Sequence, residues 1–175
     1  MNILAFGASF SPVSINHMFA SFAASHFKHG NCRLLNLSEY TLPVFMATED
    51  QVNNPPEAVI DFIDQFKWAD LVIISLAEHN GSYTAAFKNL FDWASVVDGK
   101  IFEGTKVVLL STSPGERAAQ TVMAAAKNRF PYHGANIIGD FSLPEFDTNF
   151  KPEEGIVNET LKKDFEAFIT RLPVD

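Results

Sequence analysis

The sequence is short of cysteine, of basic residues and of long apolar runs. Its single cysteine, Cys32, cannot form a disulfide within the chain, and the apolar residues that follow it predict a packed thiol rather than a reactive one. No apolar run is long enough to span a bilayer, and the chain does not open with a basic segment followed by an apolar one. These absences exclude a disulfide framework and predict a protein of the reducing cytoplasm with no membrane partner.

Positive charge is scarce as well. The 175 residues include 13 Lys and Arg against 21 Asp and Glu, which gives a formal net charge of −8. Non-specific binding to nucleic acid or anionic lipid needs clustered Lys and Arg, so we expect neither as a partner. The hydrophobic content of 47%, with 17 Phe, is enough for a sizeable core. We therefore expect a single domain over residues 1–175 whose partner is a small molecule or a protein.

Apolar runs alternate with helical periodicities along the whole chain. Runs such as Leu71 to Ile74 and Val107 to Leu110 have no polar residue on either face, which is typical of parallel strands covered by helices on both sides. The pattern predicts a doubly wound α/β fold. Two irregular stretches, 38–55 and 142–157, are candidates for the border of a site or a subunit contact. The predicted strands are 2–6, 32–37, 69–76, 106–111 and 136–141, and the predicted helices are 15–28, 56–67, 84–97, 116–129 and 158–171.

The loop after the first predicted strand is rich in small and hydroxyl-bearing residues. It runs from Gly7 to Asn16 and leads into a helix. Free backbone N–H groups and the positive end of the helix dipole favour a phosphate at such a place, and Ser9, Ser11, Ser14 and Asn16 add neutral donors. The loop lacks both the Gly-Lys-Ser/Thr ending of a P-loop and the three glycines of a dinucleotide fingerprint. A simple helix cap by Ser14 is the alternative interpretation.

Two further loops of the same kind follow the third and fourth predicted strands. In the first of them, Asn80-Gly81-Ser82 predicts a tight turn, whose exposed main chain can read the polar edge of a planar heterocycle. The second contains Ser113-Pro114-Gly115, for which a helix cap by Ser113 is again the alternative. Because ligands of parallel sheets bind beyond the carboxyl ends of the strands, the three loops together predict one ligand site.

In order and spacing, these loops resemble those of the NADPH-dependent FMN reductase family, flavodoxin-like flavin, quinone, azo-dye and chromate reductases. The first loop of that family reads Gly-Ser-x-Arg-x-x-Ser-x-Asn/Thr, and its second reads Pro-Glu-Tyr-Asn-Gly-Ser, which residues 77–82 match in part. The helix after the second loop carries the family's Lys88-Asn89 and Asp92-Trp93. The resemblance implies a flavodoxin-like three-layer sandwich with a five-stranded parallel sheet of strand order 2-1-3-4-5.

The resemblance also implies an activity. FMN would take hydride from NADPH or NADH and pass it to a small acceptor such as a quinone, flavin or azo compound by a ping-pong mechanism, with no catalytic acid or base and no metal. Arg117 is the nearest candidate contact for a nucleotide phosphate, and a homodimer or homotetramer is implied. The residues assigned to FMN, with the phosphate at the first loop and the ring at the second, are Ser9, Ser11, Ser14, Ile15, Asn16, Ala77, Glu78, His79, Asn80, Gly81, Ser82, Ser113, Pro114 and Gly115.

Several positions depart from the family pattern. Ser11 stands where the family has an arginine that binds phosphate, which predicts weaker FMN binding. His79 replaces a tyrosine, and Ala118-Ala119 replaces a Gly-Gly pair. Two alternatives stay open: an FMN electron carrier without nicotinamide turnover, and a domain that has lost FMN.

Overall fold

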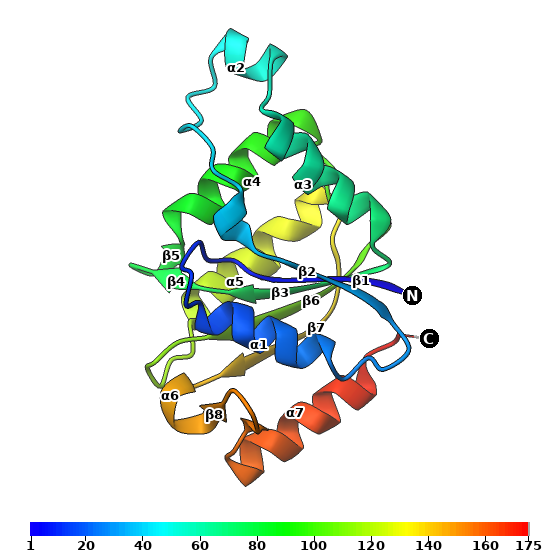
Figure 1. Cartoon of the computed structure of the whole chain (residues 1–175), viewed down its shortest axis with the longest axis vertical. Coiled ribbons are helices and arrows are strands. Elements are labelled where there is room, and N and C mark those ends of the chain that lie inside the picture. The colour runs from blue at the N-terminus through cyan, green and yellow to red at the C-terminus, as the bar shows by residue number, and fades with distance from the viewer. Residues whose placement is uncertain (175) are drawn as a thin grey trace.

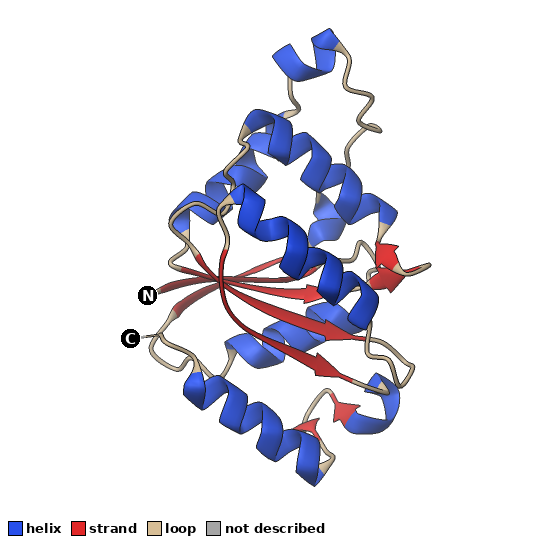
Figure 2. Ribbon diagram, turned by 180° about the vertical axis from the view of Figure 1, so that it is seen from behind, coloured by secondary structure: helices blue, strands red, loops and turns tan. Residues whose placement is uncertain are grey.

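A five-stranded parallel sheet forms the centre of the molecule, seen in a computed structural model that describes residues 1–174. The strand order is β2-β1-β3-β6-β7, which is 2-1-3-4-5 when only these strands are counted, so the predicted flavodoxin-like topology is confirmed. Helices cover both faces of the sheet (Figures 1 and 2). The strands are β1 (Asn2–Gly7), β2 (Asn31–Leu35), β3 (Leu71–Leu76), β6 (Lys106–Thr112) and β7 (Asn136–Leu143).

The two faces of the sheet belong to two separate cores. On β1, Leu4 and Phe6 point into the first core, on one face of the sheet, while Ile3 and Ala5 point into the second core, on the opposite face. This alternation follows from the period of two in a strand, and because both faces are buried, the central strands are apolar except at or next to their ends. The first core is covered by α3 (Glu57–Trp68), α4 (Ala85–Val97) and α5 (Gln120–Arg129), and the second by α1 (Ile15–Ala24) and α7 (Glu159–Arg171).

Two predicted helices are shorter than expected at one end. The helix α5 begins at Gln120 rather than 116, because Ala118 and Ala119 have φ of 51° and 59°, which a right-handed helix cannot include. The helix α1 ends at Ala24 rather than 28, where the Ser25 hydroxyl donates to the Phe22 carbonyl and the chain turns away.

Short elements that leave no periodic signal complete the fold. They are α2 (Glu49–Asn53), the hairpin of β4 (Glu78–His79) and β5 (Ser82–Tyr83), α6 (Phe146–Asn149), the hairpin of β8 (Phe150–Lys151) and β9 (Gly155–Ile156), and 3₁₀ turns at Leu37–Glu39 and Phe130–His133. The helix α2 projects from the rest of the molecule at the top of Figure 1. Within residues 1–174, no helix combines the length and the apolar character that crossing a membrane requires.

The prediction that Cys32 is packed was wrong. Its strand, β2, lies at the edge of the sheet, and Cys32 is exposed. Apolar neighbours in sequence do not bury a residue on an edge strand, because only one side of the strand has a partner. The sulfur is nevertheless partly desolvated, which raises the pKa of the Cys32 thiol and disfavours the reactive thiolate.

Candidate functional site

The three predicted loops follow β1, β3 and β6 and meet at the carboxyl end of the sheet. Together they line a cavity of about 200 Å³. Val13 and Thr112 also line it and were not predicted, although the hydroxyl of Thr112 at the end of a strand is a signal of the kind used for its neighbours. Asn80, Gly81, Ser82 and Gly115 lie outside the wall. The predicted residues in the wall are Ser9, Ser11, Ser14, Ile15, Asn16, Ala77, Glu78, His79, Ser113 and Pro114.

Hydroxyl groups hold the first loop in shape. The Ser14 hydroxyl accepts a hydrogen bond from the His17 N–H at 3.1 Å and so caps α1, and the Ser9 and Ser11 hydroxyls accept from N–H groups two residues further on. A hydroxyl that accepts in this way keeps its own proton to donate. Helix geometry gives the Ile15 N–H no intrahelical acceptor. The loop therefore presents neutral donors at a positive helix end, a set that fits a phosphate.

Gly7 lets the end of β1 approach the first turn of α1. A Cβ at this position would lie 2.3 Å from the His17 nitrogen and 2.6 Å from the Asn16 carbonyl carbon, both of them backbone atoms that cannot move independently of the helix. Any side chain would push the helix N-terminus away from the sheet. The glycine is thus required for the loop's geometry.

The side chain of Asn16 is engaged within the protein. It is 3% exposed, its amide nitrogen donates to the Thr112 carbonyl at 3.3 Å, and its amide oxygen accepts from the Ser75 hydroxyl at 2.7 Å. These bonds tie the start of α1 to the ends of β3 and β6. The hydroxyl of Thr84, which caps α4, donates to the Ala8 carbonyl at 3.1 Å. This bond joins the start of α4 to the first loop, directly after β1. Asn16 therefore positions the loop, and its main chain rather than its amide is the group left for a ligand.

The second loop is a two-residue hairpin. Glu78 pairs with Tyr83 and His79 with Ser82, while Asn80 and Gly81 form the turn with φ of 52° and 74°. Two consecutive left-handed residues are the requirement of a type I′ turn, and Asn-Gly is its preferred sequence, so the tight-turn prediction is confirmed. The Glu78 carboxylate accepts from the Val122 N–H of α5 at 2.8 Å.

The third loop is held by its neighbours rather than by a helix cap. The Ser113 hydroxyl donates to the Gly115 carbonyl at 3.2 Å, so the alternative in which Ser113 caps a helix is wrong. The N–H groups of Glu145 and Phe146 donate to the carbonyls of Gly115 and Ser113. The segment 142–157 therefore contacts the third loop, and none of its residues lines the cavity. Arg117 is exposed and donates to the Thr121 hydroxyl at 3.1 Å.

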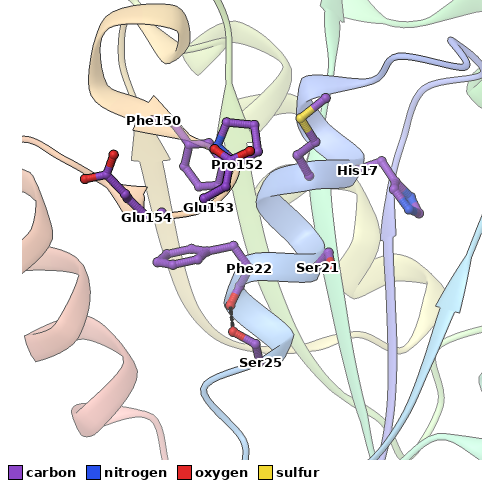
Figure 3. A pocket seen from close by; sticks show the side chains of 10 residues that line it. His17, Ser21, Phe22, Ser25, Phe150, Pro152, Glu153 and Glu154 are labelled. Carbon is purple, nitrogen blue, oxygen red and sulfur yellow. Dashed lines mark hydrogen bonds between the residues drawn. The ribbon is translucent and has the colours of Figure 1, made fainter.

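A second cavity, of about 520 Å³, lies between α1 and the β8–β9 hairpin (Figure 3). Phe22 and Phe150 lie side by side in its wall, with ring centres 5.3 Å apart, and Glu153 and Glu154 stand on the hairpin beside them. The two carboxylates disfavour an anionic ligand, and no residue of the three strand-end loops lines this cavity. Although this second cavity is the larger of the two, its lining does not support it as the phosphate-binding site.

Comparisons with known proteins give one family match and several structures of similar fold. The sequence matches the family described as NADPH-dependent FMN reductase over residues 1–148, and no curated protein sequence matches it. The fold is similar to that of FerB, a flavoenzyme NAD(P)H:(acceptor) oxidoreductase from Paracoccus denitrificans, with a TM-score of 0.77 and 23% identity over 97% of this chain and 93% of that one.

Two other solved structures share the fold at lower identity. An NADH:FMN oxidoreductase in its apo form has a TM-score of 0.68 and 16% identity over 99% of this chain and 91% of that one. An FMN-dependent NADH-azoreductase from Bacillus anthracis, solved in complex with FMN, has a TM-score of 0.70 and 16% identity over 98% of this chain and 99% of that one. The sequence match covers most of the chain and includes all three loops. The chain therefore belongs to the NADPH-dependent FMN reductase family, an oxidoreductase family with FMN as cofactor and a reduced nicotinamide nucleotide as co-substrate.

Proposed function

We propose that this protein oxidises NAD(P)H and, through FMN held by the three loops, reduces a small acceptor such as a quinone, a flavin or an azo compound. The observation that carries the proposal is a single cavity lined both by a loop rich in neutral donors at a helix N-terminus and by Ala77, Glu78 and His79, which lead into the exposed Asn80–Gly81 turn at the cavity's edge. NAD(P)H is oxidised to NAD(P)⁺, and a quinone gains two electrons and two protons, one from the nucleotide and one from water.

The first loop is proposed to hold the phosphate. The hydroxyls of Ser9, Ser11 and Ser14 and the N–H groups of Ile15 and Asn16 are its donors, and the dipole of α1 supplies partial positive charge. The loop has no Lys or Arg, so phosphate binding depends on neutral groups alone. This donor set predicts moderate rather than very tight binding.

The second and third loops are proposed to hold the ring. The main chain from Glu78 to Ser82 offers N–H donors to the pyrimidine edge, where negative charge develops on reduction, and Ser113, Pro114 and Gly115 flank the other side. FMN, when bound, supplies the redox chemistry itself, so the protein has only to bind, orient and partly shield it. No side chain is assigned an acid or base role.

The proposed kinetic mechanism is ping-pong, because nucleotide and acceptor must reach the same exposed part of the cofactor in turn. Initial rates of NADPH oxidation at several fixed quinone concentrations test this. Parallel double-reciprocal lines are expected, and converging lines would contradict the mechanism. Absence of NADPH turnover with bound FMN would favour the electron-carrier alternative.

A homodimer or homotetramer completes the proposal. The stretch 41–46 is fixed on α4, where the Pro43 carbonyl accepts from the Trp93 indole N–H at 2.9 Å and Phe45 packs on Trp93 with ring centres 5.0 Å apart. Beside these contacts Val44 is 72% exposed and Met46 is 69% exposed. Exposed apolar side chains held on a rigid support favour association with a second copy. Light scattering after size exclusion should give a multiple of 19.4 kDa; a monomer would contradict it.

The proposed location is the cytoplasm. The exposed Cys32 thiol stays reduced there.

A further inference from the structure

The helix α5 begins without a cap of its own. Its N-cap residue is Ala119, which has φ of 59° and no side chain that can accept a hydrogen bond, and Ala118 before it is also left-handed. The first N–H groups of any helix need an acceptor from outside the helix. In α5 the Gln120 N–H donates to the Arg117 carbonyl of the preceding turn at 3.0 Å, and a side-chain acceptor for the next N–H groups has to come from another part of the chain.

Glu78 supplies that acceptor. Its Oε2 accepts from the Val122 N–H at 2.8 Å, across 44 residues of sequence. Val122 is the third residue of α5, which is one of the two positions that an N-cap side chain ordinarily serves. The negative carboxylate is also favoured at the positive end of the helix dipole.

The same hairpin contacts the other end of α5. Tyr83, the strand partner of Glu78, stacks on Phe130 directly after the helix, with ring centres 6.1 Å apart and an interplanar angle of 13°. Between the two ends, Gly81 lies near Thr121, whose methyl carbon is 3.9 Å from the position that a Cβ on Gly81 would occupy. The hairpin therefore lies along α5 and is fixed to it at both strands.

We propose that Glu78 is a positioning residue, which caps α5 and thereby fixes where the Asn80–Gly81 turn presents its N–H groups. This inference rests on the proposed function, in which that turn meets the flavin. Glu78 acts through the bond to Val122 and needs an acceptor oxygen there rather than a negative charge. A glutamine keeps an acceptor at the same reach, whereas an alanine removes it.

Three variants test the proposal: Glu78→Ala, Glu78→Gln and the control Asn158→Ala. The control removes an N-cap of α7, where Asn158 accepts from two N–H groups on the opposite face of the sheet. It matches the loss of a helix cap without touching the hairpin. Amide hydrogen exchange at Val122 and residues 79–83 is measured without FMN, and the FMN dissociation constant is measured by fluorescence.

Glu78→Ala should speed exchange at Val122 and the hairpin and raise the FMN dissociation constant about tenfold, the size expected for one lost hydrogen bond. Glu78→Gln should stay within about threefold of the unmodified protein. Asn158→Ala should leave FMN binding unchanged.

Unchanged exchange in Glu78→Ala, an FMN loss no larger than that of Asn158→Ala, or a Gln variant as weak as the Ala variant would overturn the proposal. The exchange measurement needs no FMN. Failure of the unmodified protein to bind FMN would therefore refute the proposed function. The exchange rates would still show whether Glu78 caps α5 and holds the hairpin.

Discussion

Replacing Asn16 with alanine should destabilise the protein through the tie between α1 and the sheet. The substitution removes the bond from the Ser75 hydroxyl at 2.7 Å and the longer bond to the Thr112 carbonyl at 3.3 Å. Ser75 is 0% exposed, so no water replaces the lost acceptor. A buried hydroxyl without a partner costs about 1–3 kcal/mol, and the longer bond adds about 0.5–1 kcal/mol.

The expected loss in the free energy of unfolding is therefore about 1.5–4 kcal/mol. For a chain of this length that loss lowers Tm by about 3–16 °C. Urea unfolding followed by circular dichroism gives the free energy, and a thermal scan gives Tm. Asn128→Ala, an exposed residue of α5 in the same fold, is the matched control and should change stability by less than about 0.5 kcal/mol.

A double-mutant cycle separates the bond from other effects of the substitution. Ser75→Ala alone leaves the Asn16 amide oxygen without its donor, whereas Asn16→Ala with Ser75→Ala leaves neither group unpaired. The double variant should lose about 1–2 kcal/mol less than the sum of the single variants. If the losses of the two single variants simply add, or if Asn16→Ala loses no more stability than Asn128→Ala, the bond between Asn16 and Ser75 does not stabilise the fold.

Three further predictions concern the loops and the hairpin. Ser11→Arg should tighten FMN binding about tenfold at low salt, more than Ser11→Lys does, because a guanidinium binds phosphate in bidentate fashion; equal affinity for all three forms in a fluorescence titration would contradict this. Burial raises the pKa of Tyr83 to about 12, above its unfolded value near 10, so this group stabilises the fold below pH ~10 and the contribution is lost as the pH rises toward 12. Tyr83→Phe should flatten that decline in urea unfolding at pH 10–12, and an unchanged decline would count against the assignment. Ala119→Gly should raise the free energy of unfolding by about 0.5 kcal/mol. Glycine avoids the penalty of about 1–2 kcal/mol that alanine pays in the left-handed conformation, but part of this gain is offset by the greater entropy of glycine in the unfolded chain. A loss of stability as large as that of Ala20→Gly inside α1 would contradict the prediction.

The sequence was sufficient to predict the sheet, its flanking helices and the three loops that line one cavity. Strands such as β3 are apolar at every position but one because both faces are covered, and that pattern differs plainly from the period of a helix. The Asn80–Gly81 turn was predictable because few residue pairs adopt two left-handed conformations in succession.

The remaining features depend on contacts between distant residues. The cap on α5 joins Glu78 to Val122, and nothing near either residue in sequence indicates the other. Asn16 has the sequence context of a ligand donor, but its amide bonds to two strand ends that only the folded sheet brings near. Cys32 was placed wrongly because burial on a strand depends on its position in the sheet rather than on its apolar neighbours.

The visible spectrum of the protein with FMN, before and after anaerobic addition of NADPH, tests the central claim most directly. The account predicts flavin that stays with the protein through gel filtration and an absorption band near ~450 nm that bleaches on NADPH addition, since the cofactor carries the chemistry. Flavin that passes through unbound, or bound flavin that neither NADPH nor NADH bleaches, would contradict it.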